Sequence, residues 1–165
     1  MRMTRRRDGE RGQVAVYAVL LFPTLMLVLV FVLAVSSVEM LRTRLRAQLD
    51  MAALTATQAI DLGALAAGGH PALVPDKAES LARQYLAANV ASLGDQLLVT
   101  PEAVAGGAQV AVTNKAGADP ITGQAITAPT VSIRVVVPVE VPLLRLAGLR
   151  TRVDLELTGS AAARS

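Results

Sequence analysis

The chain contains no cysteine, which excludes disulfide bonds, thiolate metal sites, cysteine nucleophiles and lipid-modified cysteines. Its one histidine, His70, excludes a multi-histidine metal site. Tryptophan is absent and aromatic residues make up 2% of the chain, which argues against a base-stacking surface for single-stranded nucleic acid. Charged residues make up only 18% and hydrophobic residues 53%, so the chain is not disordered throughout. Its 165 residues suffice for one domain or one domain plus an appendage.

One apolar segment near the N-terminus dominates the sequence. It begins at Val14, ends at Val35 and contains Pro23, and none of its 22 residues is charged. At ~1.5 Å per residue a helix of this length spans roughly 33 Å, compared with about 30 Å of bilayer hydrocarbon. Fifteen of its residues are Val, Leu or Phe, and they favour insertion by roughly 5–8 kcal/mol. We therefore predict a transmembrane helix over residues 13–37 with the lipid bilayer as its partner, and interpret Pro23 as an ordinary transmembrane proline.

Arginines flank the apolar segment unevenly. Five precede it and three follow it: Arg2, Arg5, Arg6, Arg7 and Arg11, then Arg42, Arg44 and Arg46. Positive charge concentrates on the cytoplasmic side of membrane proteins. The bias predicts a cytoplasmic basic tail over residues 1–12 and an extracytoplasmic C-terminal domain. The same arginines could form a nucleic-acid patch, but topology explains them beside a membrane segment, and we expect no nucleic-acid partner.

A secretory signal peptide is the alternative interpretation of the N-terminus. Ala34 and Ser36 are small residues two positions apart, as signal peptidase requires, and cleavage there would start the mature chain near Ser37. The apolar segment is longer than the usual 7–15 residues of a signal peptide. We therefore favour a retained anchor.

The helix is expected to continue past the membrane as one unbroken element of roughly 45–50 residues. Apolar residues recur there at spacings of three and four, which places them on one face of a helix: Val38, Leu41, Leu45, Leu49, Ala52, Ala56, Ala59 and Ile60. We predict an extracytoplasmic extension over residues 38–62. We call Leu41, Leu45, Leu49, Ala52 and Ala56 the helix stripe and expect it to contact other subunits, because its alanines let a partner helix approach closely.

The residues after this helix predict an α+β head domain over residues 63–165. Gly63 and the stretch from Gly68 to Pro71 break the helix, and His70 is expected in an exposed loop. A second helix should begin near Pro75 with Asp76 as its N-cap and end at Gly94. Packed with the first helix, it should cover a small antiparallel sheet.

Alternating apolar and polar residues predict the strands of that sheet. The candidate segments are residues 96–100, 108–113, 130–141 and 149–157. Pro138 and Pro142 have no backbone donor, so we expect an edge or a bulge at that end. Residues 115–129 predict a mobile loop.

No pattern in the sequence indicates catalysis. Asp154 and Glu156 resemble an acid pair, but Arg150 and Arg152 share their strand face, and a solvated ladder of ion pairs explains all four. A histidine-dependent triad and the phosphate-binding glycine motifs are not apparent. We therefore expect no enzyme activity, no cofactor and no small-molecule substrate, and a structural or assembly role.

The N-terminal third resembles the TadE/TadG-like family of tight-adherence (Flp-type) pilus assembly systems. Residues 10–16 (ERGQVAV) are similar to the family's opening and precede an apolar segment with an internal proline. Residues 45–54 (LRAQLDMAAL) are similar to its "rLQ-x-x-D-x-AAL" helix, and residues 141–144 and 157–163 are similar, less specifically, to family C-termini. The resemblance covers residues 10–60 well. It implies an inner-membrane, pilin-like component of an envelope-spanning machine.

The resemblance also implies a possible processing site. In pseudopilins a prepilin peptidase cuts after a glycine ahead of the apolar segment, which corresponds to Gly12, with Gln13 as the first mature residue. A glutamate that aids subunit registration is then expected at position 17, where this chain has Tyr17. This departure favours an uncleaved, TadG-like anchor over a filament subunit.

Two hypotheses about function therefore follow from the sequence. The first is a single-pass inner-membrane component of Tad/Flp-type pilus assembly, TadG-like or minor pseudopilin-like, that acts by protein–protein contacts through the long helix and the head. The alternative is a membrane-tethered or secreted extracellular binding module, unrelated to pili, that recognises a ligand with residues 115–129.

Overall fold

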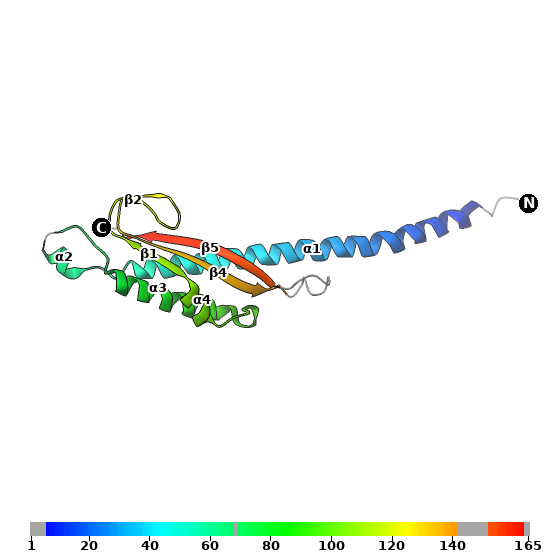
Figure 1. Ribbon diagram of the computed structural model, residues 1–165. Coiled ribbons are helices and arrows are strands. Elements are labelled where there is room, and N and C mark those ends of the chain that lie inside the picture. Colours follow the sequence, from blue (N-terminus) through cyan, green and yellow to red (C-terminus); the bar gives the residue numbers. More distant parts are fainter. Residues whose placement is uncertain (1–5, 68, 142–151, 164–165) are drawn as a thin grey trace, which may run out of the picture.

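The computed structural model describes residues 6–67, 69–141 and 152–163 and has the predicted α+β architecture. Its longest element, α1 (Arg6–Ala56), is a single helix of 51 residues. The other elements gather around the C-terminal half of α1, whereas the N-terminal half extends alone (Figure 1). We call residues 38–56 of α1, together with the described residues that follow, the head.

The long helix is confirmed, but both of its ends differ from the prediction. It begins at Arg6, inside the predicted tail, and ends at Ala56 rather than at residue 62. The Thr57 hydroxyl donates to the Leu54 carbonyl over 2.7 Å, and the Thr57, Gln58 and Ala59 N–H groups turn back to carbonyls three residues earlier. The apolar pattern continues beyond the helix because Ala59 is fully buried in the same core.

A short connection joins α1 to the second long helix. Asp61 caps α2 (Leu62–Ala66) by accepting from the Gly63 and Ala64 N–H groups. The chain then returns beside α1 as α3 (Pro75–Val90). The predicted N-cap is wrong: Val74 caps α3 without a side-chain bond and Pro75 is the first helical residue, because proline suits a position whose N–H would be unpaired. Asp76 lies in the first turn.

The α-helix ends before the predicted Gly94. A 3-10 helix, η1 (Ala91–Gln96), follows α3, and Gly94 within it has φ 52. A residue with a side chain rarely adopts this left-handed conformation. Gly94 therefore kinks the chain within η1 rather than ending α3.

Three antiparallel strands in the order β1-β4-β5 form the main sheet. They are β1 (Gln109–Thr113), β4 (Thr130–Glu140) and β5 (Arg152–Ala162). The predicted strands over residues 108–113 and 130–141 are confirmed. Residues 149–151 of the last predicted strand lie outside the described residues. That strand also continues past Leu157, since its pairing with β4 runs on to Thr130 and Ala162.

One face of the sheet packs against the helices and completes the core. The β4 side chains on this face are all at most 2% exposed: Val131, Ile133, Val135, Val137 and Val139. α1 packs against α3, β4 and β5, and α3 packs against β1. On the opposite face the predicted ion pairs occur in part: Arg152 contacts Asp154 at 3.0 Å, while Glu156 pairs with Arg134 of β4. Arg150 lies outside the described residues.

The strand predicted over residues 96–100 is wrong. Only Leu97 pairs, in an isolated bridge with Val139, and the chain then enters a helix that the sequence analysis missed, α4 (Pro101–Gly107). Thr100 caps it by accepting from the Ala103 N–H at 3.2 Å. The signal for this helix was the pair Thr100-Pro101, an N-cap followed by proline at the first helical position.

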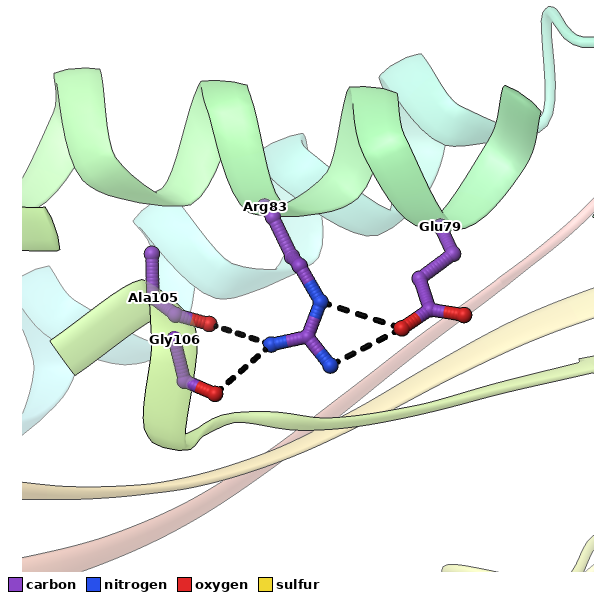
Figure 2. A network of polar contacts seen from close by, with 4 residues as sticks. All are labelled: Glu79, Arg83, Ala105 and Gly106. Atoms are coloured by element: carbon purple, nitrogen blue, oxygen red, sulfur yellow. Dashed lines mark hydrogen bonds and ion pairs between the residues drawn. The ribbon is translucent and has the colours of Figure 1, made fainter. Parts of the chain in front are cut away.

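Arg83 of α3 holds the C-terminal end of α4. Its guanidinium donates to the carbonyls of Ala105 and Gly106 at 2.7 and 2.9 Å, and its other nitrogens contact Glu79 (Figure 2). The last carbonyls of a helix have no partner within the helix. Arg83 supplies one and thereby ties α4 to α3.

Pro138 lies in the central strand and costs no hydrogen bond there. β1 begins at Gln109, opposite Arg134, so among the described residues no strand pairs with β4 at Pro138 on that side. The Pro138 carbonyl accepts from the Leu98 N–H at 3.2 Å. The expectation of a locally open edge is met at Pro138, whereas Pro142 lies outside the described residues.

Residues 115–129 contain a hairpin that the prediction of a mobile loop missed. Its strands are β2 (Gly117–Ala118) and β3 (Ala125–Ile126), which pair antiparallel. Gly123, with φ 71, lies in the turn between them. The hairpin lies at the same end of the sheet as the C-terminus (Figure 1).

Candidate functional site

The apolar segment of α1 is the most unusual surface of the molecule. From Val16 to Val35 almost every large side chain points into solvent, with Val19 at 71%, Phe22 at 64% and Leu27 at 68% exposed. An uninterrupted apolar surface of this kind is unfavourable in water. The helix is long and apolar enough to span a membrane. Of the predicted anchor residues, Pro23 and Val35 lie in this segment, and Val14 lies in α1 just before it.

Pro23 does not interrupt the helix. Because proline has no N–H, the usual bond to the carbonyl four residues earlier is missing. The next residue, Thr24, donates its hydroxyl to the Leu20 carbonyl at 2.9 Å. α1 therefore passes through Pro23 as one element.

The apolar segment and the head meet without a linker. The Ser37 hydroxyl donates to the Ala34 carbonyl at 2.7 Å, and Leu41, one turn further on, is already 8% exposed and part of the core. A hollow of about 150 Å³ at this junction is lined by α1, by Gln96 and by the end of β4. The orientation of the head relative to the apolar segment is therefore set by a continuous helix.

The helix stripe lies inside the head. Its five side chains are at most 8% exposed and belong to one core cluster: Leu41, Leu45, Leu49, Ala52 and Ala56. The residues opposite them on α3 are also small or apolar, namely Ala78, Ala82, Leu86 and Val90. The partner that approaches the alanines of α1 is thus the head of the same chain, and the stripe is not a surface open to other subunits.

The proposed processing residues lie in a helix. Gly12 and Gln13 both fall within α1, which begins six residues before Gly12. The backbone there is helical rather than an extended segment ahead of the helix. Tyr17, at the position of the expected glutamate, is 61% exposed on the same helix.

A buried carboxylate that the sequence analysis missed organises the β2–β3 hairpin. Asp119 is 3% exposed and accepts from the Ile121 and Thr122 N–H groups at 2.7 and 2.9 Å. Its second oxygen accepts from the hydroxyl of Ser132, a residue of β4 that is 2% exposed. Burial raises the pKa of this carboxyl, but these hydrogen bonds outweigh it and lower the pKa below 3.8. The run of Asp119, Pro120 and Gly123 was the available signal for a turn.

A polar hollow of about 480 Å³ lies where the hairpin approaches α1 and β5. Arg46 and Asp50 of α1, Thr122 and Gln124 of the hairpin, and Ser160 of β5 line it. The hairpin that the binding-module hypothesis uses is thus anchored to β4 by Asp119 and borders an open polar surface.

The described residues contain no group of three or more His, Asp and Glu side chains that could hold a metal ion. His70 is exposed in the connection between α2 and α3. Asp154 and Glu156 each face an arginine on the exposed side of the sheet. Within the described part of the chain, these carboxylates have the exposed ion-pair environment of a solvated strand face.

Comparison of the chain with protein-family models, with curated proteins and with solved structures gives no match in any of the three. The fold and the exposed apolar helix therefore carry the functional argument.

Proposed function

We propose that the protein is a single-pass membrane component of Tad/Flp-type pilus assembly, TadG-like or minor pseudopilin-like, that acts by protein–protein contacts. The observation that carries the proposal is the continuity of α1, which is exposed and apolar from Val16 to Val35 and contributes to the core of the head from Leu41 onward. A helix shared in this way resists extraction into water and fixes the head at the membrane. This arrangement, together with the resemblance of residues 10–60, supports a pilin-like role.

The location follows from the same helix and from the arginines. The N-terminus is in the cytoplasm, the apolar segment crosses the inner membrane, and the head is extracytoplasmic, since five arginines precede the apolar segment and three follow it. Alkaline phosphatase fused after Ser165 should be active in cells. A stable but inactive fusion would contradict this orientation.

The first residue of the mature protein distinguishes an uncleaved, TadG-like anchor from a processed pseudopilin. The intact mass of the membrane-purified protein should correspond to an uncleaved chain, as expected for a TadG-like anchor. A first residue of Gln13 indicates a processed pseudopilin, and a first residue near Ser37 removes the anchor and contradicts a membrane role.

Complementation separates pilus assembly from the binding-module alternative. In a strain lacking the gene, the wild-type chain should restore surface pili, measured as surface-exposed major pilin. A chain whose residues 1–37 are replaced by a cleavable signal peptide releases the same head outside the membrane and should not restore them. Unchanged piliation in the deletion strain contradicts the pilus role, and full activity of the released head favours a binding module.

A further inference from the structure

The end of the head nearest the apolar segment is formed by the connection between α3 and α4. Among the described elements in Figure 1, this connection and the C-terminal end of β4 lie closest to the free half of α1. Gln96 and Glu140 line the same hollow as Ser37 and Arg44 of α1. Leu97 pairs with Val139, next to Glu140 in β4. These contacts place the connection at the level of residues 37–44 of α1, directly after the predicted membrane segment.

That level corresponds to the headgroup layer of a bilayer. The headgroup region adds about 5–7 Å to each side of the hydrocarbon. At about 1.5 Å per residue, the first four or five residues of α1 after Ser37 cross this layer. Because no linker separates the apolar segment from the head, the connection cannot stand clear of the membrane. A helical segment slightly longer than the hydrocarbon thickness tilts in the bilayer. A tilt toward the side of α1 that carries the head brings the connection closer to the membrane.

Exposed apolar side chains lie at this end of the head. Leu98 is 43% exposed and Val99 is 40% exposed, although both follow Leu97, which is partly buried against the core and pairs with Val139. Met40, one turn beyond the predicted membrane segment on α1, is 62% exposed and lines the same hollow as Gln96. Exposure of these apolar side chains to water is unfavourable, whereas in the headgroup layer they contact lipid and are removed from water.

The charges at this end are mixed. Arg42 lies 3.9 Å from Glu39, and Arg44 lines the hollow together with Glu140. Arg152, opposite Glu140 in the sheet, contacts Asp154 at 3.0 Å. Among the described residues at this end, these opposite charges balance, so these side chains give no net attraction to anionic lipid.

We infer that the head rests on the bilayer. The connection between α3 and α4 lies in the headgroup layer, and its residues Leu98 and Val99 contact lipid. This inference rests on the proposed membrane role of α1. It identifies the lipid surface itself, and not a protein, as the partner of this end of the head.

Single-cysteine labelling tests the inference cleanly, because the natural chain has no cysteine. The variants Leu98→Cys and Val99→Cys carry an environment-sensitive fluorophore on the full chain, reconstituted into phosphatidylcholine vesicles. Leu27→Cys, in the middle of the apolar segment, reports on membrane insertion. Leu62→Cys is the matched control, since Leu62 is also an exposed leucine, at 73%, but lies in α2 at the opposite end of the head.

Nitroxides at known depths in the vesicles distinguish the outcomes. We expect the labels at positions 98 and 99 to be quenched by a headgroup nitroxide, the label at 27 by a nitroxide deep in the acyl chain, and the label at 62 by neither. Phosphatidylglycerol should leave this pattern unchanged. Circular dichroism of each variant checks its fold, and the partial exposure of Leu98 and Val99 makes either substitution tolerable.

The possible failures are distinguishable. If the labels at 98 and 99 behave like the label at 62 while the label at 27 is quenched in the chain region, the inference is wrong and the proposed membrane role stands. If the label at 27 is not quenched, the membrane role fails and the inference fails with it. Headgroup quenching at position 62 as well means that the whole head lies flat, which also contradicts the inference.

Discussion

Asp119 couples the stability of the hairpin to pH. Hydrogen bonds from Ser132, Thr122 and Ile121 outweigh the effect of burial and lower its pKa in the folded protein. The folded state therefore binds fewer protons at this group than the unfolded state, whose pKa is about 3.9. The stabilisation is fully present above the unfolded pKa and is lost as the pH falls through the lower folded value.

We expect the urea midpoint of the wild-type protein to fall when the pH is lowered from about 5 to about 2, and the fall to be smaller in Asp119→Asn. The amide keeps an acceptor for the Ile121 and Thr122 N–H groups but does not titrate. Asp119→Ala should cost about 1–3 kcal/mol at neutral pH, because it leaves buried donors without an acceptor. Equal acid sensitivity of the wild type and Asp119→Asn would show that the carboxylate is not the group responsible.

Gly159 sets the distance between β5 and α1. A Cβ at this position would lie 2.7 Å from Asp50 Oδ1 and 3.1 Å from Leu49 Cγ, and Leu49 is buried. We expect Gly159→Ala to lower the free energy of unfolding by about 1–3 kcal/mol, the usual cost of overpacking. The control is Gly106→Ala in α4, where a Cβ meets no heavy atom within 4 Å. It should be neutral or stabilising by up to about 1 kcal/mol, and similar losses in the two variants would exclude the contact with Leu49 as the cause.

At the scale of elements, Arg83 decides how firmly α4 is held. Its side chain is 33% exposed, so the ion pair with Glu79 contributes little and the bonds to the α4 carbonyls matter more. Arg83→Met keeps the apolar stem, should cost about 1 kcal/mol, and should speed hydrogen exchange of the α4 amides. Glu79→Gln leaves the α4 carbonyls paired and should leave that exchange almost unchanged. Faster exchange in Glu79→Gln as well would mean that the ion pair positions Arg83.

The elements that the sequence predicted correctly are those in which a periodic pattern of apolar residues extends over many residues. Fifty-one helical residues and the alternation in β4 are visible without tertiary information. The missed helix α4 has seven residues, and the apolar run before it suggested a strand, although only Leu97 pairs. The role of Asp119 depends on Ser132, which strand pairing brings to it, so the turn signal alone could not reveal it. Short elements and pairings between segments thus required the structure.

At the scale of the whole molecule, the helix stripe shows that periodicity predicts which face of a helix is buried but not which chain covers it. The sequence correctly placed its five residues on one face, but a buried face looks the same whether its cover comes from the same chain or from another. Here α3, β4 and β5 cover it, so any contact with other subunits must use other surfaces. Met51 and Tyr85, which are 57% and 43% exposed along the groove between α1 and α3, belong to such a surface.

The head should therefore fold without the apolar half of α1, but not without the half of α1 that forms its core. Residues 16–35 contribute almost no buried large side chain to the head, whereas Leu45, Leu49 and Ala52 form its core. A chain of residues 38–165 should be soluble and unfold cooperatively, with a melting temperature close to that of the full chain in detergent. A chain of residues 57–165 loses three buried leucines, Leu41, Leu45 and Leu49, at about 2–5 kcal/mol each, and should not fold.

Circular dichroism and thermal unfolding of the two truncated chains measure this difference. As a control, Leu49→Ala in residues 38–165 should lower stability by about 2–5 kcal/mol, while Met51→Ala, on the exposed face of the same helix, should change it by less than about 0.5 kcal/mol. A folded chain of residues 57–165 would mean that the head does not need α1. In that case α1 could swing relative to the head, and a fixed position of the head at the membrane would no longer follow.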